Sequence, residues 1–136
     1  MRRARGIGVL VLAAAGCVMP AERVPLKPLG ADAPPQPYVD LVNRARVQAT
    51  AANEAFFVDS WRDLEEFAKG LEQTAHFLPK GLEIPANHKD QIATEAGNLE
   101  KEARQLQEAA RAQNVKQANE IMQRINLIVR QLRPDR

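Results

Sequence analysis

Residues 91–132 read QIATEAGNLEKEARQLQEAARAQNVKQANEIMQRINLIVRQL. Apolar residues recur in this stretch at alternating steps of four and three, which is the spacing of one face of an α-helix. The pattern predicts two helices, the first ending near Asn114 and the second closed by Pro134. Their apolar faces are Ile92, Ala96, Leu99, Ala103, Leu106 and Ala110, and then Val115, Ala118, Ile121, Met122, Ile125, Ile128, Val129 and Leu132.

The residues before this stretch show the same spacing in two further series. The series are out of phase by one residue at Phe56 and Phe57, and the helix-capping residues Asp59 and Ser60 follow directly. We therefore expect helices over 37–57 and 60–77. One long bent helix is the alternative, because neither glycine nor proline marks the break. The series are Tyr38, Val42, Ala45, Ala49, Ala52 and Phe56, and then Phe57, Trp61, Leu64, Ala68, Leu71, Ala75 and Leu78.

A loop over 78–87 separates the two pairs of helices, and Asn87 is the expected N-cap of the third helix. Four helices joined by short connections, with one longer middle loop, predict an all-α fold and an up-down-up-down four-helix bundle. Three helices with a long bent first helix are the alternative. The largest apolar side chains expected to fill the wider layers of the core are Phe56, Phe57, Trp61 and Leu64.

The stretch LEKEARQLQEAARAQN, residues 99–114, with its short polar turn and a final helix ending in arginine, resembles the last two helices of cytochrome c-prime-type proteins. The helix and loop lengths across 38–133 are also similar to those of the soluble b-type cytochrome bundle. The resemblance implies a four-helix bundle.

The haem ligands of these families are missing. The c-prime family attaches haem through a Cys-x-x-Cys-His motif near the end of its last helix, where this chain reads LIVRQLR over 127–133. A b-type bundle needs a methionine early in the first helix and a histidine late in the last, and Val42 and Ile128 to Arg130 stand there instead. The resemblance therefore implies the fold without the activity, and no cofactor is expected.

Two histidines, His76 and His88, flank the middle loop, and Glu72 lies one turn before His76. Bundle packing could bring the three together as a zinc or copper site. The alternative is a group of half-exposed polar residues at one end of the bundle, and without a fixed spacing motif no metal is expected. Met122 is spaced as a core residue.

The first 17 residues, MRRARGIGVLVLAAAGC, combine a basic start, a short apolar run and small residues. An apolar run over 7–15 is shorter than the roughly 20 residues of a membrane-spanning helix, and it matches a signal peptide over 1–16. The ending AAGC resembles the bacterial lipobox, which implies lipidation of Cys17 and cleavage before it. Ala14 stands where that motif usually has leucine. An ordinary signal peptide cut after Ala15, leaving a soluble periplasmic protein, is the alternative.

Residues 17–36 form the expected linker, and 37–136 form the helical domain. The prolines exclude regular helix from the linker and predict an extended spacer over 18–36, up to roughly 60 Å long at about 3.1 Å per residue. They are Pro20, Pro25, Pro28, Pro34 and Pro35.

Charge argues against a nucleic-acid partner. The chain has 19 basic and 17 acidic residues, and three of the basic ones are Arg2, Arg3 and Arg5. Removal of the leader leaves 16 basic against 17 acidic residues, a net charge of −1. Val18 and Met19 follow Cys17, so an aspartate retention signal is absent. We expect a protein that is anchored in the outer membrane and faces the periplasm.

No motif for nucleophilic, metallopeptidase or nucleotide chemistry occurs in the sequence. The expected function is that of a non-catalytic envelope lipoprotein, a binding or scaffolding module with an envelope protein as partner. One alternative is a cytochrome-like electron-transfer, metal-binding or haem-binding bundle that uses Met122, His76 or His88. Another is a helical segment that pairs with a partner through the alanine-rich helix over 37–57.

Overall fold

The computed structural model describes residues 26–134, and this part of the chain is all-α. Its four helices are α1 (Tyr38–Phe57), α2 (Trp61–Phe77), α3 (Lys89–Arg111) and α4 (Val115–Gln131). Two short 3-10 helices, η1 (Leu78–Lys80) and η2 (Ala86–His88), lie in the middle loop. The expected break between 57 and 60 is confirmed, and the alternative of one long first helix is wrong.

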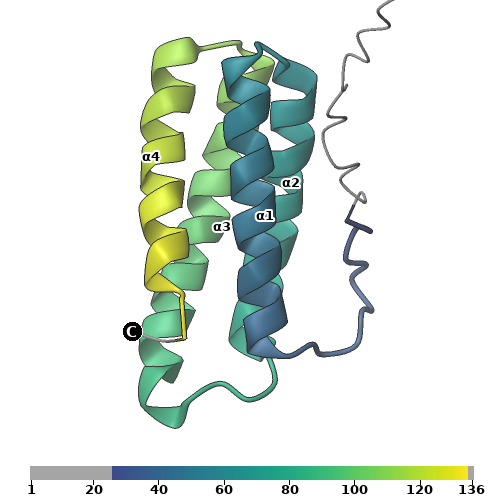
Figure 1. The fold of residues 1–136 in the computed structure, drawn as a ribbon, viewed down its shortest axis with the longest axis vertical. Coiled ribbons are helices and arrows are strands. Elements are labelled where there is room, and N and C mark those ends of the chain that lie inside the picture. The colour runs from purple at the N-terminus through teal and green to yellow at the C-terminus, as the bar shows by residue number, and fades with distance from the viewer. Residues whose placement is uncertain (1–25, 135–136) are drawn as a thin grey trace, which may run out of the picture.

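The four helices lie side by side in a bundle-like arrangement (Figure 1). α1 packs against α2 and α4, and α3 packs against the same two helices, with the α2–α3 seam the most extensive and the α1–α4 seam the least. The α1–α2 and α3–α4 connections lie at one end of the molecule, and the α2–α3 loop lies at the other (Figure 1). We call the first of these ends the turn end and the second the loop end.

The predicted apolar faces form the core, with four exceptions. Phe56 and Trp61 are half-buried, whereas Phe57 is 81% exposed and Val115 is 57% exposed. The expectation that Phe57 fills the core is therefore wrong. Phe57 shares its spacing with the α2 series, but it is the last residue of α1. The α1–α2 turn separates it in sequence from Trp61, the first residue of α2.

Both connections at the turn end use three residues and the same cap. The amide of Ser60 donates to the Ala55 carbonyl and that of Asp59 to Phe56, while Asn114 donates to Ala109 and Gln113 to Ala110. These paired bonds are the Schellman motif, which needs a residue in the left-handed region. Asp59 (φ 56°) and Gln113 (φ 51°) take that conformation in place of glycine. This explains how α1 ends without glycine or proline.

The next helix after each turn begins differently. Asn114 caps α4 with its side chain, which accepts a hydrogen bond of 3.0 Å from the Gln117 amide. Ser60 instead donates its hydroxyl to Asp63 at 2.8 Å. The expected N-cap Asn87 lies inside η2, and α3 begins at Lys89.

The loop end is closed by backbone pairing between the start of α1 and the middle loop. The Leu82 amide donates to the Gln36 carbonyl at 2.8 Å, and the Tyr38 amide donates to the Leu82 carbonyl at 2.9 Å. Gly81 permits this approach, because a Cβ there would lie 3.0 Å from the Tyr38 Cα. The start of α1 and the loop before α3 are thereby held together.

The described part of the proline-rich segment, residues 26–37, contacts the helices. The Arg44 guanidinium donates to the Lys27 carbonyl, Leu29 packs against the core, and the Ala33 amide donates to the Gly30 carbonyl at 3.0 Å. Figure 1 shows this segment running from the start of α1 alongside α2. The sequence predicts an extended spacer over 18–36; in its described part, the apolar Leu29 side chain packs against the bundle.

Candidate functional site

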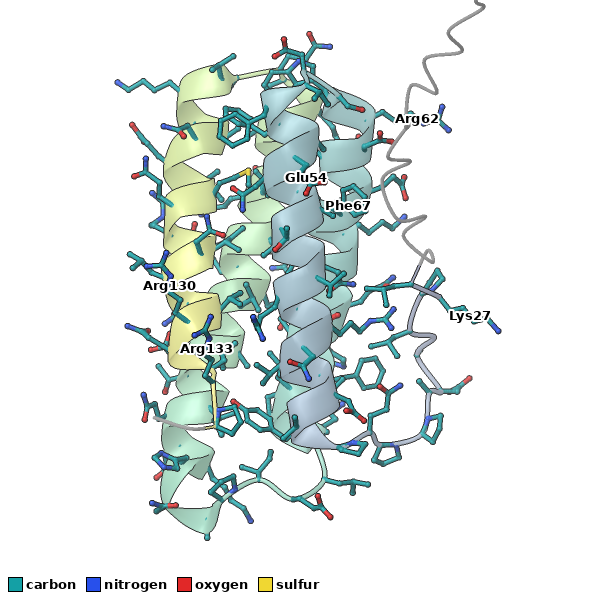
Figure 2. All side chains as sticks on the ribbon, viewed as in Figure 1. Lys27, Glu54, Arg62, Phe67, Arg130 and Arg133 are labelled. Atoms are coloured by element: carbon teal, nitrogen blue, oxygen red, sulfur yellow. The ribbon has the colours of Figure 1, made fainter. Side chains whose placement is uncertain are left out.

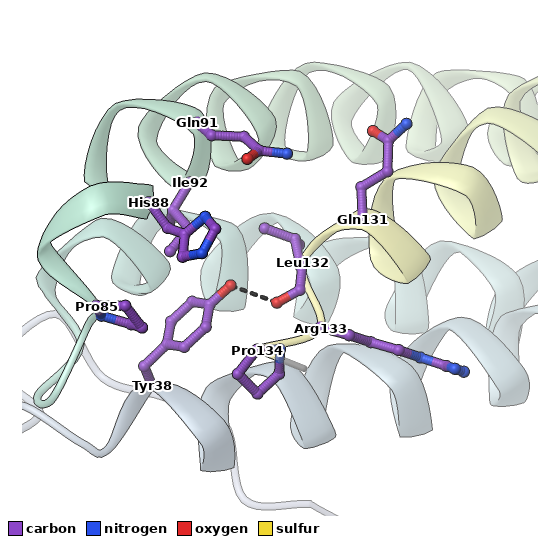
Figure 3. A pocket seen from close by; sticks show the side chains of 9 residues that line it. All are labelled: Tyr38, Pro85, His88, Gln91, Ile92, Gln131, Leu132, Arg133 and Pro134. Carbon is purple, nitrogen blue, oxygen red and sulfur yellow. Dashed lines mark hydrogen bonds between the residues drawn. The ribbon is translucent and has the colours of Figure 1, made fainter. Parts of the chain in front are cut away.

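Two surface cavities lie in the described part of the chain at the positions of the predicted site residues. The first, of about 400 Å³, is at the loop end between the start of α1, the start of α3 and the end of α4 (Figure 3). Its walls include Tyr38, Pro85, His88, Ile92 and Pro134. In Figure 3 the His88 and Tyr38 rings both border the cavity, whereas Arg133 points away from them. The polar residues of the lining are His88, Gln91, Gln131 and Arg133, and the others are mainly apolar.

Tyr38 has a structural partner in this cavity. Its hydroxyl donates to the Leu132 carbonyl and joins the first residue of α1 to the end of α4. The side chain is almost fully buried, and desolvation by burial raises the pKa of Tyr38 to about 12. The phenol is held neutral and already hydrogen-bonded, so it acts as a tie between helices.

The second cavity, of about 350 Å³, lies under the N-terminal segment. Leu29 and Ala31 form one wall, and α2 and α3 form the others, with Glu72 and His76 among the lining residues. One Glu72 carboxylate oxygen accepts from Arg104 Nε at 3.4 Å, and the other accepts from the Gln107 amide nitrogen. Both oxygens therefore have protein partners.

His76 contacts one residue of its own helix and one residue of η1. Its Nε2 lies 3.3 Å from Lys80 Nζ, and its ring meets the Phe77 ring edge to face at 5.7 Å between centroids. An ammonium group next to an imidazole nitrogen competes with a metal cation for the same lone pair.

Glu72, His76 and His88, the candidate ligands of a metal site, do not come together. Glu72 and His76 line the second cavity, whereas His88 lines the first. Within residues 26–134, no three His, Cys, Asp or Glu side chains are grouped so that they could hold a metal ion. The sequence placed both histidines near the middle loop, but the loop separates them to different sides of the bundle.

Met122, the methionine named for the haem alternative, and most residues at the positions of the missing haem ligands are part of the packed core, whereas His76 is exposed and His88 half-buried. Met122 is 3% exposed, and Val42 and Val129 are buried within the same cluster. Arg130 is exposed on α4. Met122 therefore has the environment of a core side chain, as its spacing predicted.

Two polar pairs within the bundle were not foreseen from the sequence. The Thr74 hydroxyl donates to Gln48 Oε1 at 2.7 Å, and both residues are buried between α1 and α2. Asn53 and Asn126 join α1 to α4, with 3.1 Å from Asn53 Nδ2 to Asn126 Oδ1. Gly70 is the only sequence signal for the first pair, because a Cβ there would lie 2.8 Å from Gln48 Nε2.

No family model, curated protein or solved structure matches the chain.

The N-terminal features named from the sequence lie outside the described residues. These are the signal peptide over 1–16, Cys17, and the first part of the linker, 18–25. Among the helices of residues 26–134, none combines the length and the apolar composition that crossing a membrane requires.

Proposed function

We propose that this protein is a non-catalytic lipoprotein of the cell envelope, whose helical domain serves as a binding or scaffolding module for an envelope partner. The observation that carries the proposal is the sequence AAGC at 14–17, preceded by a basic start and a short apolar run. A diacylglyceryl group on Cys17 would anchor the chain in the outer membrane. The helical domain would then face the periplasm.

A non-catalytic role is supported by the partners of two polar side chains, one in each cavity. The Tyr38 hydroxyl binds the Leu132 carbonyl, and the Glu72 carboxylate binds Arg104 and Gln107. A general base or nucleophile needs a free partner atom for its substrate. These side chains instead stabilise contacts between helices.

An up-down-up-down bundle is the arrangement that we propose for the module. Two three-residue turns at one end and the longer loop at the other support it. In such a lipoprotein, the contacts of Lys27 and Leu29 would hold the described part of the linker against the helices.

Mass spectrometry of the protein purified from bacterial membranes tests the anchor. We expect a mature chain that begins at Cys17 and carries acyl groups. The variant Cys17→Ser should accumulate as the full-length precursor, because the thioether cannot form. A mature chain that begins at Gly16, without acyl groups, would contradict the proposal and indicate a soluble periplasmic protein.

A further inference from the structure

The turn end of the bundle exposes the most accessible large apolar side chains of residues 26–134. Phe57 is 81% exposed and Val58 is 73% exposed, and the next, Val115, is 57% exposed. Val115 begins α4 directly after the other three-residue turn, at the same end of the molecule (Figure 1). We name Phe57, Val58 and Val115 the apolar tip.

The apolar tip rests on a rigid base. The Phe56 ring meets the Phe57 ring at 6.1 Å and the Trp61 ring at 6.0 Å, both edge to face. Phe56 and Trp61 in turn pack against the core. The Schellman bonds of Asp59 and Ser60 fix the turn between them. Exposure of Phe57 is thus a property of a well-defined turn, and burial of its ring against an apolar partner would be favourable.

We propose that the apolar tip inserts into the surface of the membrane to which Cys17 is anchored. This inference rests on the proposed lipidation. Aromatic and aliphatic side chains at an exposed turn suit the boundary between headgroups and acyl chains. Exposed Arg62 and Lys116 follow Trp61 and Val115 in sequence, and Figure 2 shows Arg62 near the turn end.

The length of the chain between the lipid anchor and the bundle favours a membrane as the partner of the apolar tip. The N-terminal segment runs alongside α2 in the direction of the turn end (Figure 1). Lys27 is held by Arg44, which lies 13 residues before Phe57 in α1, or about 20 Å along the helix axis. The ten residue steps from Cys17 to Lys27 can span at most about 35 Å. This reach exceeds the distance to the apolar tip, so a lipid on Cys17 and the apolar tip can meet the same membrane surface.

Electrostatic attraction contributes little to this contact. Asp59 and Asp63 stand at the same end as Arg62 and Lys116, so the turn end has no basic surplus. Burial of Phe57 and Val58 is the main driving force, and the contact should persist when the ionic strength is raised.

Trp61 reports on the contact, because it is the single tryptophan of the chain and its ring meets Phe56, whose ring in turn meets Phe57. The mature lipidated protein would be reconstituted into vesicles of phosphatidylethanolamine and phosphatidylglycerol with brominated acyl chains, which quench nearby tryptophan. Flotation of the vesicles measures anchoring, and loss of Trp61 fluorescence measures proximity of the tip. We expect flotation together with quenching that salt does not remove.

The variant Phe57→Ser/Val58→Ser should float with the vesicles and lose the quenching. The matched control is Val39→Ser/Val47→Ser, which changes two half-exposed valines of α1 away from the tip and should keep the quenching. Circular dichroism checks that each variant is folded. Flotation of the unsubstituted protein without quenching would overturn the tip proposal and leave the lipid anchor intact. Absence of flotation would overturn both.

Discussion

Tyr38 couples the stability of this domain to alkaline pH. Its hydroxyl is hydrogen-bonded and desolvated in the folded chain, where its pKa is raised from 10.0 to about 12. The unfolded chain therefore releases the phenol proton at a lower pH than the folded chain. The contribution of Tyr38 to the free energy of unfolding is therefore fully present below pH 10. It is lost as the pH rises from 10 to about 12.

We expect this fall to amount to roughly 2–3 kcal/mol, at about 1.4 kcal/mol per pKa unit. Denaturant unfolding at several pH values measures it, and tyrosinate absorbance follows the titration directly because Tyr38 is the single tyrosine. In Tyr38→Phe the domain should be less stable by about 1 kcal/mol at neutral pH. The part of the alkaline fall that belongs to Tyr38 should be absent from that variant; an identical fall in both proteins would contradict the assignment.

Gln113 shows how a single backbone angle sets stability. A non-glycine residue in the left-handed region costs roughly 1–2 kcal/mol, partly offset by the greater freedom of glycine in the unfolded chain. We expect Gln113→Gly to raise the free energy of unfolding by about 0.5–1 kcal/mol. The control Gln113→Ala keeps a Cβ at the same φ of 51° and should give no gain. Equal stability of the glycine and alanine variants would count against strain at this turn.

The α1–α2 interface depends on the space that Gly70 leaves for Gln48. A Cβ at Gly70 would lie 2.8 Å from Gln48 Nε2, and Gln48 cannot move away without disturbing its bond to the buried Thr74 hydroxyl. We therefore expect Gly70→Ala to destabilise the domain by about 1–3 kcal/mol, as overpacking does.

A double-mutant cycle isolates this steric conflict. In the Gln48→Ala background the clash is gone, and alanine has a helix propensity about 1 kcal/mol better than glycine, so Gly70→Ala should become neutral or stabilising. Thermal or denaturant unfolding of the four proteins gives the coupling. Equal effects of Gly70→Ala in both backgrounds would show that the side chain of Gln48 is not the obstacle.

Among the elements, the helices were predictable and their ends were not. Apolar residues at steps of three and four specify which face is buried, and α1 to α4 follow that pattern closely. Helix ends depend on backbone geometry that residue types only bias. Asp59 and Gln113 take a conformation usually left to glycine, and Asn87 lies in η2 where capping of α3 was expected.

For the whole molecule, the missing information was long-range. Spacing along the chain placed Glu72, His76 and His88 near one loop, but packing put them in two cavities. The proline-rich segment has no periodicity that would reveal the contacts of Lys27 and Leu29 with the helices. The periodicity likewise predicted that Phe57 is buried. The turn that exposes it contains no glycine, so the residue types did not reveal that turn.

The pairing of Leu82 with Gln36 and Tyr38 also determines how the domain bears mechanical load. A pull from the N-terminal side of the chain acts first on the contacts of residues 27–33 and then on the two backbone hydrogen bonds at Leu82. Only after these have opened does tension reach the first turn of α1, where Tyr38 is tied to the end of α4. The contacts of the segment would therefore break in steps before the first turn of α1 was pulled away from the bundle.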